Sequence, residues 1–578
     1  MDADIIRLVE QIQNVVNNDI AVMERVAYEL LTRATTADVS VIDRMNTVYK
    51  RLEHIAHKPM MDVAEIDRRH RWPVLPSNYA LLPHQKVGVE WMFRRSSITN
   101  AGMRGGILAL PVGVGKTLTL VTYAAMVQGV HVYVCKNDLI STVRADVQKF
   151  YPTTKYFLLD QKRNPKPFNL FTGEAVANAG CKLVIVSYNT LVKLAGIAGK
   201  IERRTSKSDT ESFKTAEEMF RHTWSTVICD ESQEFCTDNS TFAAVMALRK
   251  HHGFCSTATP VNENTTDIGN QLRFCGLIMP NGVKHYNESM YEQMNLDRNV
   301  LYIPKSDMHL TLPPVHHHDV NVTLTQQERY MFEQEKKKTL AIYMQSKKHK
   351  VSKLSVQHSL ERTRQCIVAA STLCTGKGSV NALDGYGLDP STEADAYRWL
   401  RDDRGTAGMM SSKINAIADI IRHVPRDEKV VVYSRFPAVN DLIEKRLTVE
   451  FGAQFDTLRL CTASASSKKR EDVLERMRTR ESCRVMIMGK SGSVGLNLVW
   501  ASHLILAEPD WNARNVSQVL GRLERIGQSR HVHVYHVQTP GTMEMNVRRD
   551  CEKKRKAADD FMRGVNIDKD DLDTIINA

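Results

Sequence analysis

The stretch from Gly105 to Thr117 constrains the fold of this chain more than any other feature. An apolar run leads into Val-Gly-Val-Gly-Lys-Thr, and an apolar helical pattern continues through Val121. Glycine lets backbone N–H groups turn inward around an anion, and the helix that follows aims its positive end at the same place. We expect Lys116 to reach terminal phosphates and the Thr117 hydroxyl to hold magnesium. Against the alternative of an ordinary strand–turn–helix, the pattern predicts a phosphate-binding loop made by Val112, Gly113, Val114, Gly115, Lys116, Thr117 and Leu118.

Length and composition narrow the class of protein. A chain of 578 residues exceeds one ordinary domain, and 42% hydrophobic residues are enough for several cores. No apolar stretch is long enough to span a membrane, and the acidic start lacks an apolar signal region. The eleven cysteines are scattered without a C-x-x-C pair, which favours reduced thiols. We therefore expect an intracellular protein without a membrane partner, whose net charge of +12 suits a polyanion.

Two blocks of alternating strand and helix patterns predict an α/β protein with two parallel sheets. The strand candidates are Ile107–Ala109, Val132–Cys135, Leu183–Val186, Val227–Cys229 and Phe254–Ser256 in the first block, and Val430–Tyr433, Val485–Met488, Leu504–Leu506 and Val532–Tyr535 in the second. We predict five segments: a helical N-terminal segment 1–72, a first lobe 73–304, a helical basic protrusion and linker 305–410, a second lobe 411–548 and a charged tail 549–578. Residues 195–221 are expected to form an insertion, and residues 376–409 a flexible connection.

A second polar motif follows the strand candidate Val227–Cys229, which ends in Asp230 and Glu231. Asp230 can hold magnesium, and Glu231 can orient and deprotonate an attacking water. Strands often end in such a pair simply as a turn. The pair lies about one hundred residues after the phosphate loop on the same predicted sheet, whose strand ends meet at one edge. The two motifs together predict a nucleotide triphosphate site.

Three further motifs fit such a site. The amide of Gln85 can donate and accept at once, which suits an adenine edge. The small hydroxyl residues of 256–260 can relay a change at the phosphates to neighbouring loops. Arg522 and Arg525 are three apart, on one predicted helical face, and can neutralise charge on a transferring phosphoryl group. Each motif alone is also consistent with an ordinary turn or a basic surface helix.

Two basic clusters leave alternatives open. Lys336–Lys338 and the lysines near Lys347 fit either a solvated helix face or a wall along a nucleic-acid backbone. The run Lys553–Lys556 fits either a nuclear-import signal or a solvated helix end.

As a set, the motifs resemble those of superfamily-two helicases and, within them, the Swi/Snf-type DNA translocases. The matching segments are Leu82–Gln85, Gly105–Thr117, Val184–Tyr188, Asp230–Glu231, Thr257–Pro260, Val430–Phe436, Gly495–Leu498, Asp510–Asn512 and Arg525–Gln528. They occur in the family's order over most of the chain, and Arg525–Gln528 is the most family-specific. Departures are Leu110-Pro111 in place of Asp-Glu, Gln233 in place of histidine, and Lys490 and Ser493 in place of arginine and glycine.

The resemblance implies two RecA-like lobes and an ATP hydrolase that moves along double-stranded DNA. ATP and Mg²⁺ would lie between the lobes, with Lys116, Glu231, Arg522 and Arg525 as the catalytic set and Gly495 as a further nucleotide contact. The expected nucleic-acid contacts are Lys136, Ser187, Asn189 and Lys490.

The resemblance extends to nucleic-acid-dependent NTPases of large DNA viruses, so localisation in a nucleus, a host cell or a virion stays open, and no motif identifies a protein partner. One alternative is an RNA-directed helicase or an NTPase of viral transcription. Another is a non-catalytic scaffold that binds nucleotide.

Overall fold

The computed structural model describes residues 63–76, 79–96, 104–159, 180–198, 218–237, 239–260, 266–277, 299–308, 310–347, 352–374, 411–460, 467–489, 496–510 and 512–562. Most of the N-terminal helical segment, most of the insertion, the flexible connection and the end of the charged tail lie outside these residues. The chain divides into a first unit, residues 1–310 with 556–578, and a second unit, residues 311–555.

The first unit is built on a seven-stranded parallel sheet with the order β3-β4-β2-β5-β6-β1-β7. Its strands are β1 (Gly105–Ala109), β2 (His131–Cys135), β3 (Tyr156–Leu159), β4 (Leu183–Ser187), β5 (Trp224–Asp230), β6 (Lys250–Thr257) and β7 (Val300–Tyr302). The residues of β1, β2 and β4 are buried throughout, as expected for parallel strands covered on both faces.

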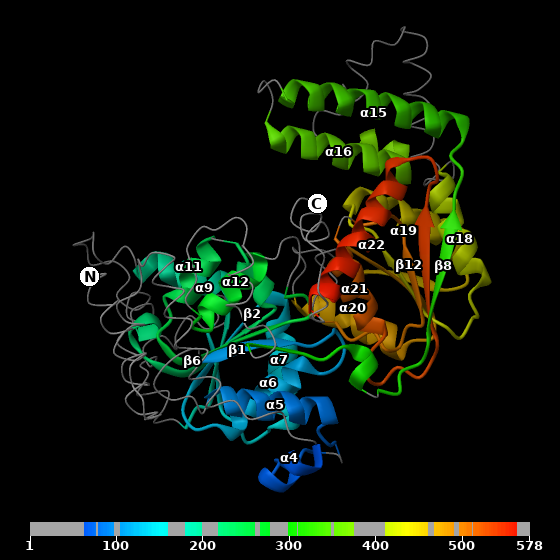
Figure 1. Ribbon diagram of the computed structural model, residues 1–578. Helices are drawn as coiled ribbons and strands as arrows, with labels where there is room; N and C mark the ends of the chain where they lie inside the picture. Colours follow the sequence, from blue (N-terminus) through cyan, green and yellow to red (C-terminus); the bar gives the residue numbers. More distant parts are fainter. Residues whose placement is uncertain are drawn as a thin grey trace, which may run out of the picture. The chain divides into compact units, whose positions relative to one another are not determined.

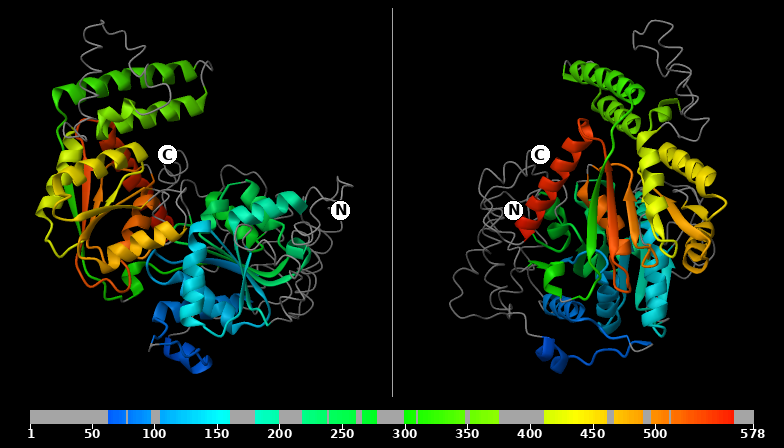
Figure 2. Two further views of the ribbon diagram at one scale, coloured as in Figure 1. Left: turned by 180° about the vertical axis from the view of Figure 1, so that it is seen from behind. Right: turned by 90° about the vertical axis from the view of Figure 1, so that its right-hand side faces the viewer.

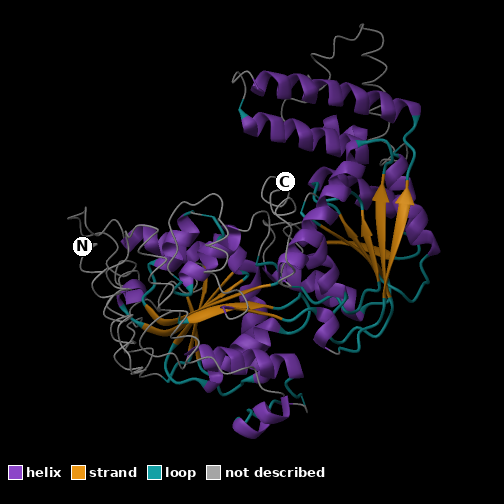
Figure 3. Ribbon diagram, in the orientation of Figure 1, coloured by secondary structure: helices purple, strands orange, loops and turns teal. Residues whose placement is uncertain are grey.

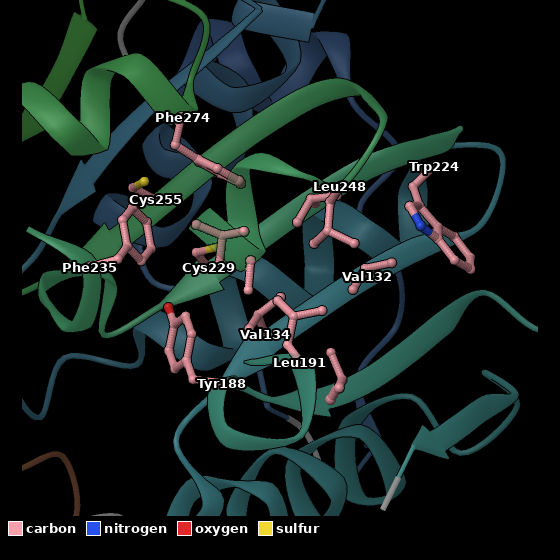
Figure 4. Packing of buried hydrophobic residues seen from close by; sticks show 14 of the residues in the cluster. Val132, Val134, Tyr188, Leu191, Trp224, Cys229, Phe235, Leu248, Cys255 and Phe274 are labelled. Carbon is pink, nitrogen blue, oxygen red and sulfur yellow. The ribbon is translucent and has the colours of Figure 1, made fainter. Parts of the chain in front are cut away.

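Helices cover both faces of this sheet (Figures 1 and 3). One layer holds α5 (Pro83–Ser96), α6 (Lys116–Met126) and α7 (Ile140–Phe150); the other holds α9 (Tyr188–Ala198), α11 (Ser240–Met246) and α12 (Thr266–Phe274). The short helix α4 (Val63–Arg69) packs on α5. Figure 4 shows the core beneath the second layer, where Val132 and Val134 pack with Leu191 and Phe274. Because side chains alternate along a strand, Tyr133 between these valines points to the layer of α5 and α6.

The second unit contains a six-stranded parallel sheet with the order β10-β11-β9-β12-β13-β8. Its strands are β8 (Val315–Asn321), β9 (Val430–Tyr433), β10 (Asp456–Leu460), β11 (Cys483–Met488), β12 (His503–Leu506) and β13 (Val532–Gln538). Its helices are α18 (Ser412–His423), α19 (Pro437–Phe451), α20 (Ser467–Thr479), α21 (Ala513–Leu523) and, up to residue 555, α22 (Met543–Met562). Two more helices, α15 (Gln326–Lys347) and α16 (Lys353–Val368), lie side by side beyond the sheet (Figure 2).

Every strand candidate from the sequence lies within an observed strand, and four strands were missed: β3, β7, β8 and β10. The most consequential is β8, Val-His-His-His-Asp-Val-Asn, because it falls in the range 305–410 that we expected to be helical. It pairs in parallel with β13 along its whole length. The second sheet thus draws on residues outside the range 411–548.

None of the helices in the described ranges combines the length and the apolar character that a membrane crossing requires.

Candidate nucleotide site

The phosphate loop connects β1 to α6, as predicted, and its backbone depends on glycine. Gly113 and Gly115 both have φ of +88°, a conformation that side chains disfavour. A Cβ on Gly115 would also lie 2.2 Å from Nε2 of Gln85. No side chain caps the first turn of α6. Backbone N–H groups of this turn are therefore directed toward the loop, where an anion can bind them.

Lys116 is the first residue of α6, and its side chain folds back over the loop. Its Nζ donates to the carbonyl oxygens of Leu110 at 2.9 Å and Pro111 at 3.0 Å. The ammonium group is thus held at the loop by acceptors that a phosphate can replace. The departure from the family pattern at Leu110-Pro111 concerns residues that meet the lysine through their backbone, which any residue supplies.

Gln85 lies against the loop from α5. Its Nε2 donates to the carbonyl of Val114 at 3.3 Å, and its Oε1 accepts from the backbone N–H of Leu82 at 2.9 Å. His84 Nε2 contacts the same Val114 carbonyl at 2.8 Å, and burial lowers the pKa of this histidine. The predicted adenine contact of Gln85 would exchange these bonds for bonds to the base.

Asp230 ends β5 on the same edge of the sheet as the loop. Its Oδ1 accepts from the N–H of Glu231 at 3.0 Å, and its Oδ2 accepts from the Tyr133 hydroxyl at 2.8 Å. Burial raises the pKa of Asp230 to about 6, helped by the charge of Glu231, while Tyr133 and Lys116 oppose the rise. Thr117, in the first turn of α6, lies beside the same tyrosine. The structure thus brings Lys116, Thr117, Asp230 and Glu231 to one place.

These residues fit a magnesium ion. Thr117 and Asp230 offer hard oxygen ligands, and two adjacent buried carboxylates favour a nearby cation. Within the described part of the chain, no three His, Cys, Asp or Glu side chains cluster as a metal cage. Mg²⁺ commonly takes one or two protein ligands and completes its shell with phosphate and water. Bound there, it would neutralise phosphate charge.

Glu231 is the start of a hydrogen-bonded chain to the segment 256–260. It is the one non-glycine residue with positive φ, +53°, among the described residues, a conformation that costs on the order of 1 kcal/mol. Gln233 Nε2 donates to Glu231 Oε2, and Gln233 Oε1 accepts from the Thr257 hydroxyl. The Thr257 oxygen in turn accepts from the N–H of Thr259 at 3.0 Å. Glutamine, in the place of the family's histidine, thus donates on one side and accepts on the other.

The two arginines differ from our expectation of one helical face. Arg522 lies buried in the last turn of α21, which ends at Leu523, so Arg525 falls in the loop beyond it. The Arg525 guanidinium donates to the Leu496 carbonyl at 3.4 Å. Residues three or four apart share one face only within a continuous helix, and α21 ends between Arg522 and Arg525.

Gln528 ends the segment Arg525–Gln528, and the hydrogen bonds of its side chain explain why this position holds a glutamine. Its Nε2 donates to the carbonyls of Ala501 at 2.8 Å and Leu523 at 3.2 Å. Its Oε1 accepts from the N–H groups of Ser529 and Arg530, both at 3.0 Å. One buried amide therefore fixes the turn that carries Arg525.

The residues expected to contact nucleic acid differ in their exposure. Lys136 pairs with Glu234 at 2.7 Å, with 23% of its side chain exposed, and Asn189 is exposed. Ser187 is fully buried: its hydroxyl donates to Thr190 Oγ1 at 2.9 Å and accepts from the Thr190 N–H at 3.1 Å. This hydroxyl caps α9, so its hydrogen bonds are made within the protein. Lys490 and Gly495 lie outside the described residues.

The sequence did not point to Tyr133. The one available signal was a phenol within the otherwise aliphatic core of β2, and only the fold shows that it faces Thr117 and Asp230.

Comparisons with known proteins agree with this arrangement. The family model described as SNF2-related domain matches residues 84–371, and the model described as helicase conserved C-terminal domain matches residues 412–527. A protein of Invertebrate iridescent virus 6 named as a helicase, 172L, is 24% identical over 85% of this chain and 92% of its own length. YwqA of Bacillus subtilis, named as an ATP-dependent helicase/translocase, is 22% identical over 84% of this chain, which spans 49% of YwqA.

Among solved structures, the Sulfolobus solfataricus SWI2/SNF2 ATPase core in complex with dsDNA has 18% identity and a TM-score of 0.35, covering 86% of this chain and 96% of that one. The two family matches together cover all strands of the first sheet and all strands of the second sheet except β13. The chain belongs to the Swi/Snf-type proteins of helicase superfamily two, and is, as a member of that family, a nucleic-acid-dependent ATP hydrolase.

Proposed function

We propose that this protein is a motor that uses ATP hydrolysis to move along double-stranded DNA. The observation that carries the proposal is the convergence of Lys116, Thr117, Asp230 and Glu231 on one edge of the first sheet. Four residues from two separate segments, the start of α6 and the end of β5, meet beside a loop whose glycines leave its backbone open to an anion. That combination suits a nucleoside triphosphate with its metal.

The roles follow from the positions. Lys116 would leave the carbonyls of Leu110 and Pro111 for the terminal phosphates. Thr117 and Asp230 would hold Mg²⁺, and Glu231 would orient the attacking water and accept its proton. Its bond to Gln233 gives Glu231 a link to the segment 256–260, so that a change at the phosphates would reach a second loop.

The second unit would contribute positive charge during hydrolysis through Arg522 and Arg525. Such arginines are typically worth on the order of 10³–10⁵ in rate. Within the second unit, Gln528 fixes the turn of Arg525, which keeps a mobile side chain near one position. Gly495 is proposed as a further nucleotide contact of this unit.

Duplex DNA is proposed as the nucleic acid along which the protein moves. Lys136 and Asn189 are the described candidates for phosphate contact, and Lys490 is a candidate beyond them. Contacts of this kind bind the backbone and are only weakly sequence-specific, so affinity should fall steeply with salt. The relative named as a helicase/translocase supports movement along a nucleic acid, and the viral relative supports a viral origin.

Phosphate release by the full chain, measured with duplex DNA, single-stranded DNA, branched DNA and RNA, tests the proposal. We expect the largest stimulation by duplex DNA and loss of turnover in Glu231→Gln, with nucleotide binding kept. Stimulation by RNA alone would favour the RNA-directed alternative. Nucleotide binding without turnover on any of these nucleic acids would favour the non-catalytic scaffold.

A further inference from the structure

Tyr133 lies where the two proposed metal ligands meet. It stands on the central strand β2, opposite Ile185 of β4 and Ile228 of β5, and its side chain is fully buried. Its position on the α6 face of the sheet brings its hydroxyl to Asp230 Oδ2 at 2.8 Å. Thr117, in the first turn of α6, lies beside the same phenol. One side chain thus links the phosphate loop to the end of β5.

The direction of these hydrogen bonds matters for metal binding. An ionised carboxylate can only accept, so the Tyr133 hydroxyl donates to Asp230. The phenol has then used its single proton, so its oxygen can only accept from a further neighbour. A bond to Thr117 would have the threonine hydroxyl as donor and would leave the lone pairs of Thr117 for another partner. Asp230 offers about four acceptor positions and uses two for the Glu231 N–H and the phenol, so it also keeps acceptor capacity.

We propose that Tyr133 is a positioning residue for the divalent cation: its phenol orients the Thr117 hydroxyl and the Asp230 carboxylate so that both present free lone pairs to Mg²⁺. This inference rests on the proposed nucleotide site and adds a residue to it. Hydrogen-bond partners behind metal ligands typically contribute 10- to 100-fold to metal affinity.

The fold supplies a matched control. Tyr151 is also buried in the first unit, and its hydroxyl donates to another threonine of α6, Thr122 Oγ1, at 2.7 Å. Removing this hydroxyl deletes the same kind of bond on the same helix. Tyr151 contacts neither Thr117 nor Asp230 through any bond found in the described residues. A general loss of packing or of helix α6 should therefore affect both variants alike.

Binding of a fluorescent methylanthraniloyl-ATP to the full chain tests the inference, with titrations in excess EDTA and at a series of Mg²⁺ concentrations. For Tyr133→Phe we expect unchanged affinity in EDTA and a roughly tenfold higher Mg²⁺ concentration for half-maximal enhancement of binding. Tyr151→Phe should match the wild type in both conditions. The melting temperature of each variant is measured alongside.

Three results would overturn the inference. The first is an unchanged Mg²⁺ requirement in Tyr133→Phe, and the second is a lower requirement, which would mean that the phenol competes with the metal. The third is an equal loss of nucleotide affinity in EDTA and in Mg²⁺, which would mean a structural role. If Tyr133→Phe does not fold, Tyr133→Met, which keeps an apolar side chain without a hydroxyl, takes its place. A wild-type protein that binds no nucleotide in either buffer would instead reject the proposed function.

Discussion

Lowering the pH should weaken the pairing of β8 with β13. Three histidines of β8 each bond a histidine of β13 or its flank: His316 with His531 at 3.1 Å, His317 with His536 at 3.0 Å and His318 with His533 at 3.0 Å. Each bond needs one nitrogen with a proton and one without, so two protonated rings cannot form it. Burial, together with the positive charge of Arg548, lowers the pKa of His536 to about 4.

The pKa difference of His536 between the folded and unfolded states sets the direction and size of the change in the free energy of unfolding. Because the folded pKa lies below the ordinary value of 6.5, the unfolded chain binds more protons between about pH 6.5 and 4. The free energy of unfolding is therefore intact above pH 6.5 and falls as the pH drops through this window. One pKa unit corresponds to ~1.4 kcal/mol, so lowering the pH to 5 would remove roughly 2 kcal/mol for a fully shielded ring. His536 is partly exposed, and solvent screening reduces the expected loss to about 1 kcal/mol.

Hydrogen exchange of peptides from β8 and β13, followed across a urea series at pH 7 and pH 5 and corrected for intrinsic exchange, measures this loss. In His536→Gln the difference between the two pH values should shrink by about 1 kcal/mol. The control is His251→Gln, at an exposed histidine of the first unit, which should leave the difference unchanged. The reasoning fails if His536→Gln and the wild type lose the same free energy on acidification.

Three substitutions test other parts of the structure. Gly115→Ala forces φ of +88° on a residue with a Cβ and pushes it against Gln85, so nucleotide affinity in a fluorescence titration should fall at least about tenfold; wild-type affinity would contradict the assigned loop. Glu544→Ala strands the buried Lys413, now paired at 2.7 Å, and should cost about 3–5 kcal/mol in urea unfolding. A loss below 1 kcal/mol would show that water reaches the lysine. Gln528→Ala should slow ATP turnover at unchanged nucleotide affinity, and an equal turnover rate would separate this turn from catalysis.

The strands that carry the site could be predicted because their sequences are nearly continuous runs of β-branched and aliphatic residues. Val430–Tyr433 matches its strand end to end. β8 could not be predicted, because His-His-His-Asp has the composition of a loop and becomes a strand only through pairing with β13. Propensity is a weak guide where neighbouring strands decide the structure.

Some residues of the site could likewise be predicted from the sequence, and others could not. The loop glycines, Lys116 and Asp230 have fixed spacings along the chain, so the sequence reveals them. The position of Tyr133 beside Asp230 depends on which strands pair across the fold, so the sequence pattern did not reveal it. The burial of Ser187 and its cap of α9 likewise became visible only in the structure. The helix end at Leu523, which separates Arg525 from Arg522, was not predicted either; there the Gln528 amide donates to the Leu523 carbonyl.

A triplex-displacement assay tests the central claim most directly. A third strand is annealed to a duplex far from the loading site, and its release is followed with ATP, without ATP and with the Arg525→Ala variant. We predict release that requires ATP, increases with time after a lag set by duplex length, and is lost in Arg525→Ala. Duplex-stimulated ATP hydrolysis by the wild type without any strand release would contradict movement along DNA.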